Sequence, residues 1–328
     1  MGDIPFPIRG TFYYPWYSGT DGSTSNWFDK PGCNLAVSFT CASVHMPDVG
    51  YYIQSYAKAR TDIDNMQWAK IGLGISSWFG QGHRTDTSFP SQLQAALDDG
   101  GNFQWTLYYE KEGTPGNDPS VAEIQDDLAY VLANYASHPN YLWKSGKPTI
   151  FVYTNGGDCE DVSRWAQATN NFQSWYVSMQ VFGNYQACPS QPSSWHQYAG
   201  EIGGDQQPGF SFAVAPEVWL WAEATPRVPR DLARFKADVR SMVASGEPWQ
   251  LILTYNEWGE STQIEPGTHK ITGVDWGSTF LDALAADGED DIDLLPDADI
   301  VTTGWTSTPL FSKINDNSDA TMITATAS

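Results

Sequence analysis

The chain has 328 residues, of which 41% are hydrophobic, 14% aromatic and only 17% charged. This composition supports a large core and excludes an intrinsically disordered protein. The formal net charge of -22 would repel phosphate backbones and anionic lipids, so we expect no nucleic-acid partner. No apolar run is long enough for membrane insertion, and the N-terminus lacks the pattern of a signal peptide.

Strand-like runs alternate with helical patterns along most of the chain. In chain order, the pattern predicts a strand over 10–16, a helix over 49–59, a strand over 69–78, a helix over 90–98 and a strand over 102–110. A helix with Asp118 as N-cap follows over 118–136, then a strand over 147–153, a helix over 158–169 and a strand over 174–182. The last elements are strands over 210–215 and 249–255 and helices over 229–244 and 278–286.

This alternation predicts parallel β-α-β units and an α/β fold. About seven strand–helix units fit a (β/α)8 TIM-type barrel over residues 1–287. A doubly wound open sheet is the main alternative, although no GxGxxG motif follows the first strand. Residues 288–298 are predicted to form an acidic linker, and residues 299–328 a β-rich tail or the start of an appended β-module.

The four cysteines are Cys33, Cys41, Cys159 and Cys188. They form no CxxC motif and no cluster with the spacing of zinc ligands. Of the three possible pairings, Cys33–Cys41 with Cys159–Cys188 is the local one. A disulfide would indicate an oxidising compartment.

Polar and aromatic residues gather at the carboxyl ends of the predicted strands. In a barrel these ends meet on one face, where active sites are built. We therefore expect the following strand-end residues to lie near one another: Tyr14, Trp16, Trp78, Glu110, Tyr153, Glu217, Trp219, Asn256, Glu257 and Glu260.

The densest group of polar residues follows the strand over 249–255. Glu257 and Glu260 lie three residues apart across a Trp-Gly turn, and Asn256 precedes them. Cleavage of a glycosidic bond needs one carboxylic acid to protonate the leaving oxygen and a second carboxylate as base or nucleophile. The alternative is that both are surface loop acids of an acidic protein.

Other strand-end residues leave two interpretations open. Glu110 either contacts substrate or forms a salt bridge with Lys111 or Arg84. Trp16 and Trp78 are either sugar platforms or core residues, while Tyr153 is a further candidate for substrate binding. Among the remaining polar residues, a solvated loop is favoured for His83, Arg84 and Asp86, and Glu265 is either a surface acid or a support for the site. No GxSxG, HExxH or Walker motif appears, and we predict no metal or cofactor.

The run NEWGESTQIEP over 256–266 resembles the motif of glycoside hydrolase family 99, the endo-α-mannosidase family. The likeness extends to FYYPWY over 12–17, Ser77-Trp78, YYE over 108–110 and KPTIFVY over 147–153, and it spans residues 8–285. The resemblance implies a (β/α)8 barrel and an endo-acting, retaining, metal-independent cleavage of α-linked oligo- or polysaccharide.

The resemblance also implies residue roles. Glu257 matches the base that deprotonates the sugar 2-hydroxyl, which then displaces the aglycone through a 1,2-anhydro sugar. Glu260 matches the acid/base that protonates the leaving group. The positions that line the subsite of the reacting sugar are matched by Asn256, Trp78, Tyr14 and Glu110.

Two other functions remain as alternatives. One is a non-catalytic carbohydrate-binding or adhesion domain, and the other a relative associated with glycosyltransferases, for which no nucleotide-binding Gly loop is visible. The tail resembles the start of modules in secreted or phage-tail proteins. We therefore expect an extracellular or virion-associated protein that acts on cell-envelope glycans.

Overall fold

The computed structural model describes residues 4–20, 27, 43–114, 117–198, 203–220, 223–270 and 272–290. The predicted tail, most of the predicted linker, and both Cys33 and Cys41 lie outside these residues. No helix in the described chain is both long enough and apolar enough to cross a membrane.

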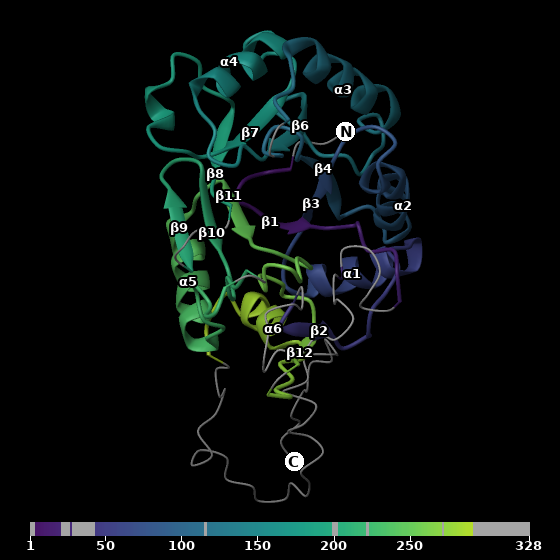
Figure 1. Cartoon of the computed structure of the whole chain (residues 1–328), viewed down its shortest axis with the longest axis vertical. Helices are drawn as coiled ribbons and strands as arrows, with labels where there is room; N and C mark the ends of the chain where they lie inside the picture. Colours follow the sequence, from purple (N-terminus) through teal and green to yellow (C-terminus); the bar gives the residue numbers. More distant parts are fainter. Residues whose placement is uncertain are drawn as a thin grey trace, which may run out of the picture. The chain divides into compact units, whose positions relative to one another are not determined.

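Eight parallel strands form the centre of the molecule (Figure 1). They are β1 (Ile8–Tyr13), β3 (Leu73–Trp78), β4 (Gln104–Tyr109), β6 (Lys147–Val152), β7 (Tyr176–Gln180), β8 (Ser194–His196), β10 (Ser211–Val214) and β11 (Trp249–Ile252). Parallel ladders join them in the order β8-β7-β6-β4-β3-β1-β11-β10. The two end strands, β8 and β10, lie in contact without a described ladder, so the sheet is a nearly closed barrel. The TIM-type barrel is confirmed, and the open-sheet alternative is wrong.

Helices surround the strands (Figure 1). These are α1 (Tyr56–Trp68), α2 (Arg84–Asp98), α3 (Val121–Asn134), α4 (Cys159–Ala168), α5 (Leu232–Ser245) and α6 (Thr279–Ala285). Two connections lack an α-helix in the described chain. The β7–β8 connection contains the 3-10 turn η1 (Tyr185–Ala187), and β9 (Gly204–Gln207) precedes β10 as an antiparallel partner. Two short pairings lie outside the barrel ladder: β5 (Trp143–Lys144) with β6, and β2 (His45–Pro47) with β12 (Gly267–His269).

Several predicted bounds are wrong for identifiable reasons. The helix predicted over 49–59 begins only after Ser55, whose side chain accepts from the Lys58 N–H. The helix predicted over 90–98 begins at Arg84 after an N-cap at His83, which places Pro90 inside it. Ser120 rather than Asp118 caps α3, because Ser120 and Glu123 form a reciprocal capping box.

Aromatic side chains fill the barrel interior. The Phe12 ring lies 4.7 Å from Tyr108 and 5.7 Å from His196, and Phe151 lies 5.1 Å from both His196 and Trp249. All five residues are fully buried. The interior is therefore packed, which leaves the carboxyl ends of the strands as the place for a ligand.

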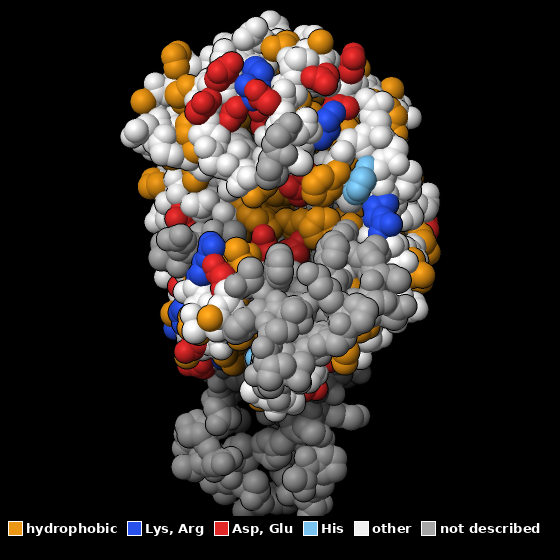
Figure 2. Space-filling model, viewed as in Figure 1, with side chains coloured by type: hydrophobic (Ala, Val, Ile, Leu, Met, Phe, Trp, Pro, Cys, Tyr) orange, Lys and Arg blue, Asp and Glu red, His pale blue; other side chains and the backbone are white. Residues whose placement is uncertain are grey.

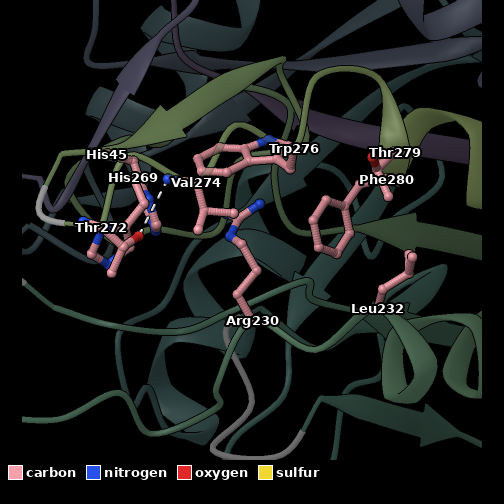
Figure 3. A pocket seen from close by; sticks show the side chains of 9 residues that line it. All are labelled: His45, Arg230, Leu232, His269, Thr272, Val274, Trp276, Thr279 and Phe280. Carbon is pink, nitrogen blue, oxygen red and sulfur yellow. Dashed lines mark hydrogen bonds between the residues drawn. The ribbon is translucent and has the colours of Figure 1, made fainter.

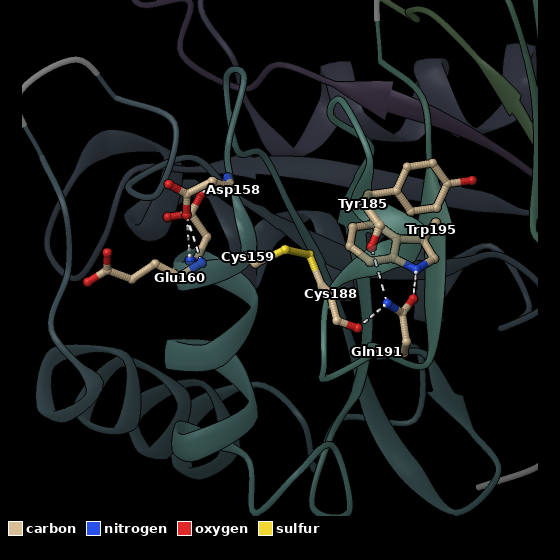
Figure 4. The surroundings of a disulfide bond; sticks show 8 residues. Asp158, Cys159, Glu160, Tyr185, Cys188, Gln191 and Trp195 are labelled. Carbon is tan, nitrogen blue, oxygen red and sulfur yellow. Dashed lines mark hydrogen bonds between the residues drawn. A yellow bond between two sulfur atoms is a disulfide. The ribbon is translucent and has the colours of Figure 1, made fainter.

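A disulfide joins two connections at these strand ends (Figure 4). Cys159 is the first residue of α4, which follows β6, and Cys188 ends the turn that follows β7. The predicted pairing of Cys159 with Cys188 is confirmed. It ties together two chain segments that secondary structure alone does not connect.

Candidate active site

Glu257 and Glu260 project from one turn after β11. The Glu257 N–H donates to Thr254 Oγ1 over 2.8 Å, and the Gly259 N–H donates to Glu257 Oε1 over 3.0 Å. Glu257 is only 6% exposed, and Glu260 is half-buried. Neither has an ion-pair partner within the described residues. The interpretation of both as solvated loop acids is therefore wrong for Glu257.

Burial and mutual repulsion disturb the ionisation of this pair. Burial raises the pKa of Glu257 well above its usual value, and the negative charge of Glu260 raises it further. Burial also raises the pKa of Glu260, whereas the Tyr198 hydroxyl and the charge of Arg227 lower it. Two acids that resist simultaneous ionisation carry one proton between them over a range of pH. This is the state required of an acid–base pair.

Glu110 is a third carboxyl group of the site. It follows β4, and its Oε1 accepts from Ser77 Oγ over 2.7 Å. Burial raises its pKa to about 8, with a further contribution from the charge of Glu260. Lys111 pairs instead with Asp127, and Arg84 donates to the Trp16 carbonyl. The salt-bridge interpretation of Glu110 is therefore wrong.

Two tyrosines connect β1 to Glu260. The hydroxyls of Tyr14 and Tyr198 lie 2.5 Å apart, and Tyr198 donates to Glu260 Oε2 over 3.1 Å. The Tyr153 ring lies 5.8 Å from Tyr198, and its pKa is raised to about 12 by burial and by the charges of Glu260 and Glu110. Tyr14 and Tyr153 were predicted from the sequence, whereas Tyr198 was not.

The reason for this omission is the brevity of β8. Three residues, Ser194–His196, give too little alternation to indicate a strand. The sequence did contain one signal, because a barrel of eight strands requires one more than the seven that were predicted. That strand had to lie in the long interval between 182 and 210, where Tyr198 follows Trp195 and His196.

Two predicted ligand residues face inward instead. Both ends of the Asn256 amide bond the Tyr14 backbone, so Asn256 ties the end of β11 to the end of β1. Trp78 is fully buried, and its indole N–H donates to Asp86 over 2.8 Å. These contacts give both residues a positioning role and leave no open ring face on Trp78. Trp16 is the more accessible indole and lies 4.6 Å from the Tyr14 ring.

A buried ion pair supports the turn that carries Glu257 and Glu260. Lys58 Nζ lies 2.7 Å from Glu265, which also accepts from the Tyr52 hydroxyl and the Trp258 indole. Trp258 is the residue next to Glu257. Glu265 is therefore a structural support and not a surface acid.

Two further polar clusters lie outside the site. Glu217 pairs with His45 and Arg230, beside a pocket of about 260 Å3 whose described lining includes none of the three site carboxyls (Figure 3). Glu112, Asp118 and Asp161 lie close enough to hold a metal ion. Arg164 pairs with all three, and its single positive charge offsets part of theirs.

A hollow opens in the middle of one face of the molecule, with hydrophobic side chains around it and acidic side chains inside it (Figure 2). A carboxyl group in such a place is costly unless it is paired or used. A hollow lined by hydrophobic side chains with a few acidic groups is typical of a site that binds small molecules.

The sequence matches no model of a known protein family and no curated protein. Two solved structures of the GH99 endo-α-mannosidase from Bacteroides thetaiotaomicron do match, one of them in complex with bis-tris propane. Their TM-scores are 0.68 and 0.67, with 19% identity, 87% of this chain covered and 97% of each matched chain. The chain therefore shares the barrel fold of the GH99 glycoside hydrolases.

Proposed function

We propose that the protein is an endo-acting, retaining glycosidase that cleaves α-linked oligo- or polysaccharide, with Glu257 and Glu260 as its catalytic residues. The observation that carries the proposal is the pair of coupled carboxyls on one turn at the mouth of the barrel, each with a raised pKa. The tyrosines around them and the fold shared with GH99 enzymes support it.

In the proposed first step, Glu257 accepts the proton of the sugar 2-hydroxyl. The oxygen of that hydroxyl, O2, attacks C1 of the same sugar. The bond between C1 and the leaving oxygen breaks, and Glu260 donates a proton to that oxygen. In the second step, Glu260 takes a proton from water, and the water oxygen bonds to C1. The bond from C1 to O2 then breaks and Glu257 returns the proton to O2, which gives net retention.

In the free protein, Tyr198 and Arg227 favour the negative charge on Glu260, which is opposite to its proposed role as the acid. A bound 2-hydroxyl that donates to Glu257 stabilises the carboxylate there and so favours a proton on Glu260. Glu110, with its pKa of about 8, remains neutral at pH 7 and can donate to a sugar oxygen.

The test is a panel of α-linked glycans, including α-mannan, incubated with the natural protein and with Glu260→Gln. We expect products from one member of the panel and a loss of at least about 1,000-fold in the variant. Glu160→Gln changes an exposed acid at the start of α4 and serves as the matched control.

Full activity of Glu260→Gln would refute the assignment. Glycan binding without product on long incubation would favour the non-catalytic alternative. Proton NMR at early times distinguishes the route, because the α-anomer appears first if the reaction retains configuration.

We further propose that the protein works in an oxidising, extracellular or virion-associated setting. The Cys159–Cys188 disulfide supports this proposal, because such bonds persist mainly outside the reducing cytosol.

A further inference from the structure

The segment that follows β10 folds back on itself next to Glu260. The Val218 N–H donates to the Val228 carbonyl, and the Arg227 N–H donates to the Val218 carbonyl over 2.8 Å. This pairing places Trp219 and Arg227 at neighbouring positions. The backbone N–H of Trp219 donates to the backbone carbonyl of Glu260 over 2.8 Å, so the two residues lie next to each other.

The Trp219 side chain is held in place and is partly exposed among the described residues. Its indole N–H donates to the Glu223 carbonyl over 3.0 Å, and its ring remains partly exposed. The nearest described ring, that of His269, lies 6.5 Å away and tilted by 41°. A fixed and partly open indole presents an apolar face at little cost in conformational entropy.

Arg227, which lies opposite Trp219, adds a planar guanidinium group that donates hydrogen bonds. Its Nε bonds Glu223 over 2.7 Å, while 41% of its side chain is exposed. Its backbone N–H bonds the carbonyl of Val218, the residue before Trp219, and its positive charge lowers the pKa of Glu260. The remaining N–H groups of a guanidinium are free to donate to hydroxyl oxygens.

We propose that Trp219 and Arg227 form the subsite for the sugar on the leaving-group side of the scissile bond. This inference rests on the proposed function, because an acid that protonates the leaving oxygen has the leaving sugar beside it. Trp219 supplies a platform for the C–H face of that sugar, and Arg227 donates to one of its hydroxyls. The site then favours a substrate that carries a sugar on this side of the scissile bond.

The test compares two substrates that differ only in the leaving group. One is the shortest oligosaccharide of the panel that the natural protein cleaves, and the other is the α-glycosyl fluoride of its non-reducing part, which has no leaving sugar. We expect Trp219→Ala to lose about tenfold in kcat/KM on the oligosaccharide, mainly through KM, and several-fold less on the fluoride. Trp219→Phe should restore part of the loss.

Trp68→Ala is the matched control, because Trp68 is also partly exposed, bonds Asp282 through its indole and ends α1 away from the site. It should leave both reactions unchanged. Equal losses by Trp219→Ala on both substrates would mean that Trp219 only positions Glu260, which refutes the subsite but not the glycosidase. If the natural protein cleaves no member of the glycan panel, both the subsite and the glycosidase are refuted.

Discussion

The surroundings of Glu260 shift the pKa of its carboxyl group in opposite directions. Burial disfavours its charge, whereas the Tyr198 hydroxyl and the Arg227 guanidinium favour it. Among the described residues, no cation lowers the pKa of its neighbour Glu257, and the charge of Glu260 raises it. The environment therefore distinguishes the two acids, and in the free protein it favours the charge on Glu260.

Arg227→Gln tests this electrostatic balance. Loss of the positive charge should raise the pKa of Glu260, so Glu260 would keep its proton to higher pH. Because the acid must be protonated to act, the alkaline limb of the plot of kcat/KM against pH should move to higher pH. The shift should be modest and should shrink at high salt, since Arg227 is partly exposed. An unchanged or lowered alkaline limb would contradict the proposed contribution of Arg227.

Among the elements, long strands were predictable and short ones were not. β3, β4 and β6 are each six residues long and almost wholly buried, and the predicted strands contain them. The three-residue β8 is too short to give a pattern and was not predicted. Tyr198, which follows it, was therefore not expected in the site. Strand-end chemistry predicted Glu257, Glu260 and Glu110, because the barrel brings consecutive carboxyl ends together.

The sequence did not show in which direction the side chains at the strand ends point. Trp78 and Asn256 lie at the expected strand ends, but their hydrogen bonds run to Asp86 and to the Tyr14 backbone. The Tyr14 backbone is distant from Asn256 in the chain, and no sequence motif identifies Asp86 as the partner of Trp78. The roles of such residues depend on contacts that only the folded barrel creates.

The Cys159–Cys188 disulfide makes a prediction for the connections that it joins. The two cysteines lie 29 residues apart, for which loop-closure entropy gives a stabilisation of about 3.6 kcal/mol. Replacement of both residues by Ser should lower the free energy of unfolding by about that amount in urea titrations. A reductant should destabilise the natural protein but not the double Ser variant, and equal stability of the two oxidised proteins would contradict this account.

For the whole molecule, buried acids make stability depend on pH. The pKa of Glu110 is raised to about 8 and that of Glu112 to about 7, mainly by burial. A raised pKa means that the folded state binds the proton more tightly than the unfolded state. This stabilisation is fully present below about pH 4.5 and is lost as the pH rises through the folded-state pKa of each group.

Glu110→Gln should therefore flatten the decline of stability between pH 4.5 and 8. The amide stays neutral, so the variant should gain on the natural protein by about 1.4 kcal/mol for each unit of the pKa shift that it removes. Urea titrations at several pH values measure this gain, with Glu160→Gln as control. Parallel pH profiles of the natural protein and Glu110→Gln would contradict the assignment of a buried, proton-binding Glu110.

The most direct measurement of the central claim is kcat on one cleaved glycan for Glu257→Gln, Glu260→Gln and the double variant. Residues that act as one catalytic unit have strongly non-additive effects. We therefore expect each single change to lower kcat by at least about 1,000-fold and the double change to lower it little further. Losses that multiply in the double variant, or near-natural activity in either single variant, would contradict a shared acid–base mechanism at this turn.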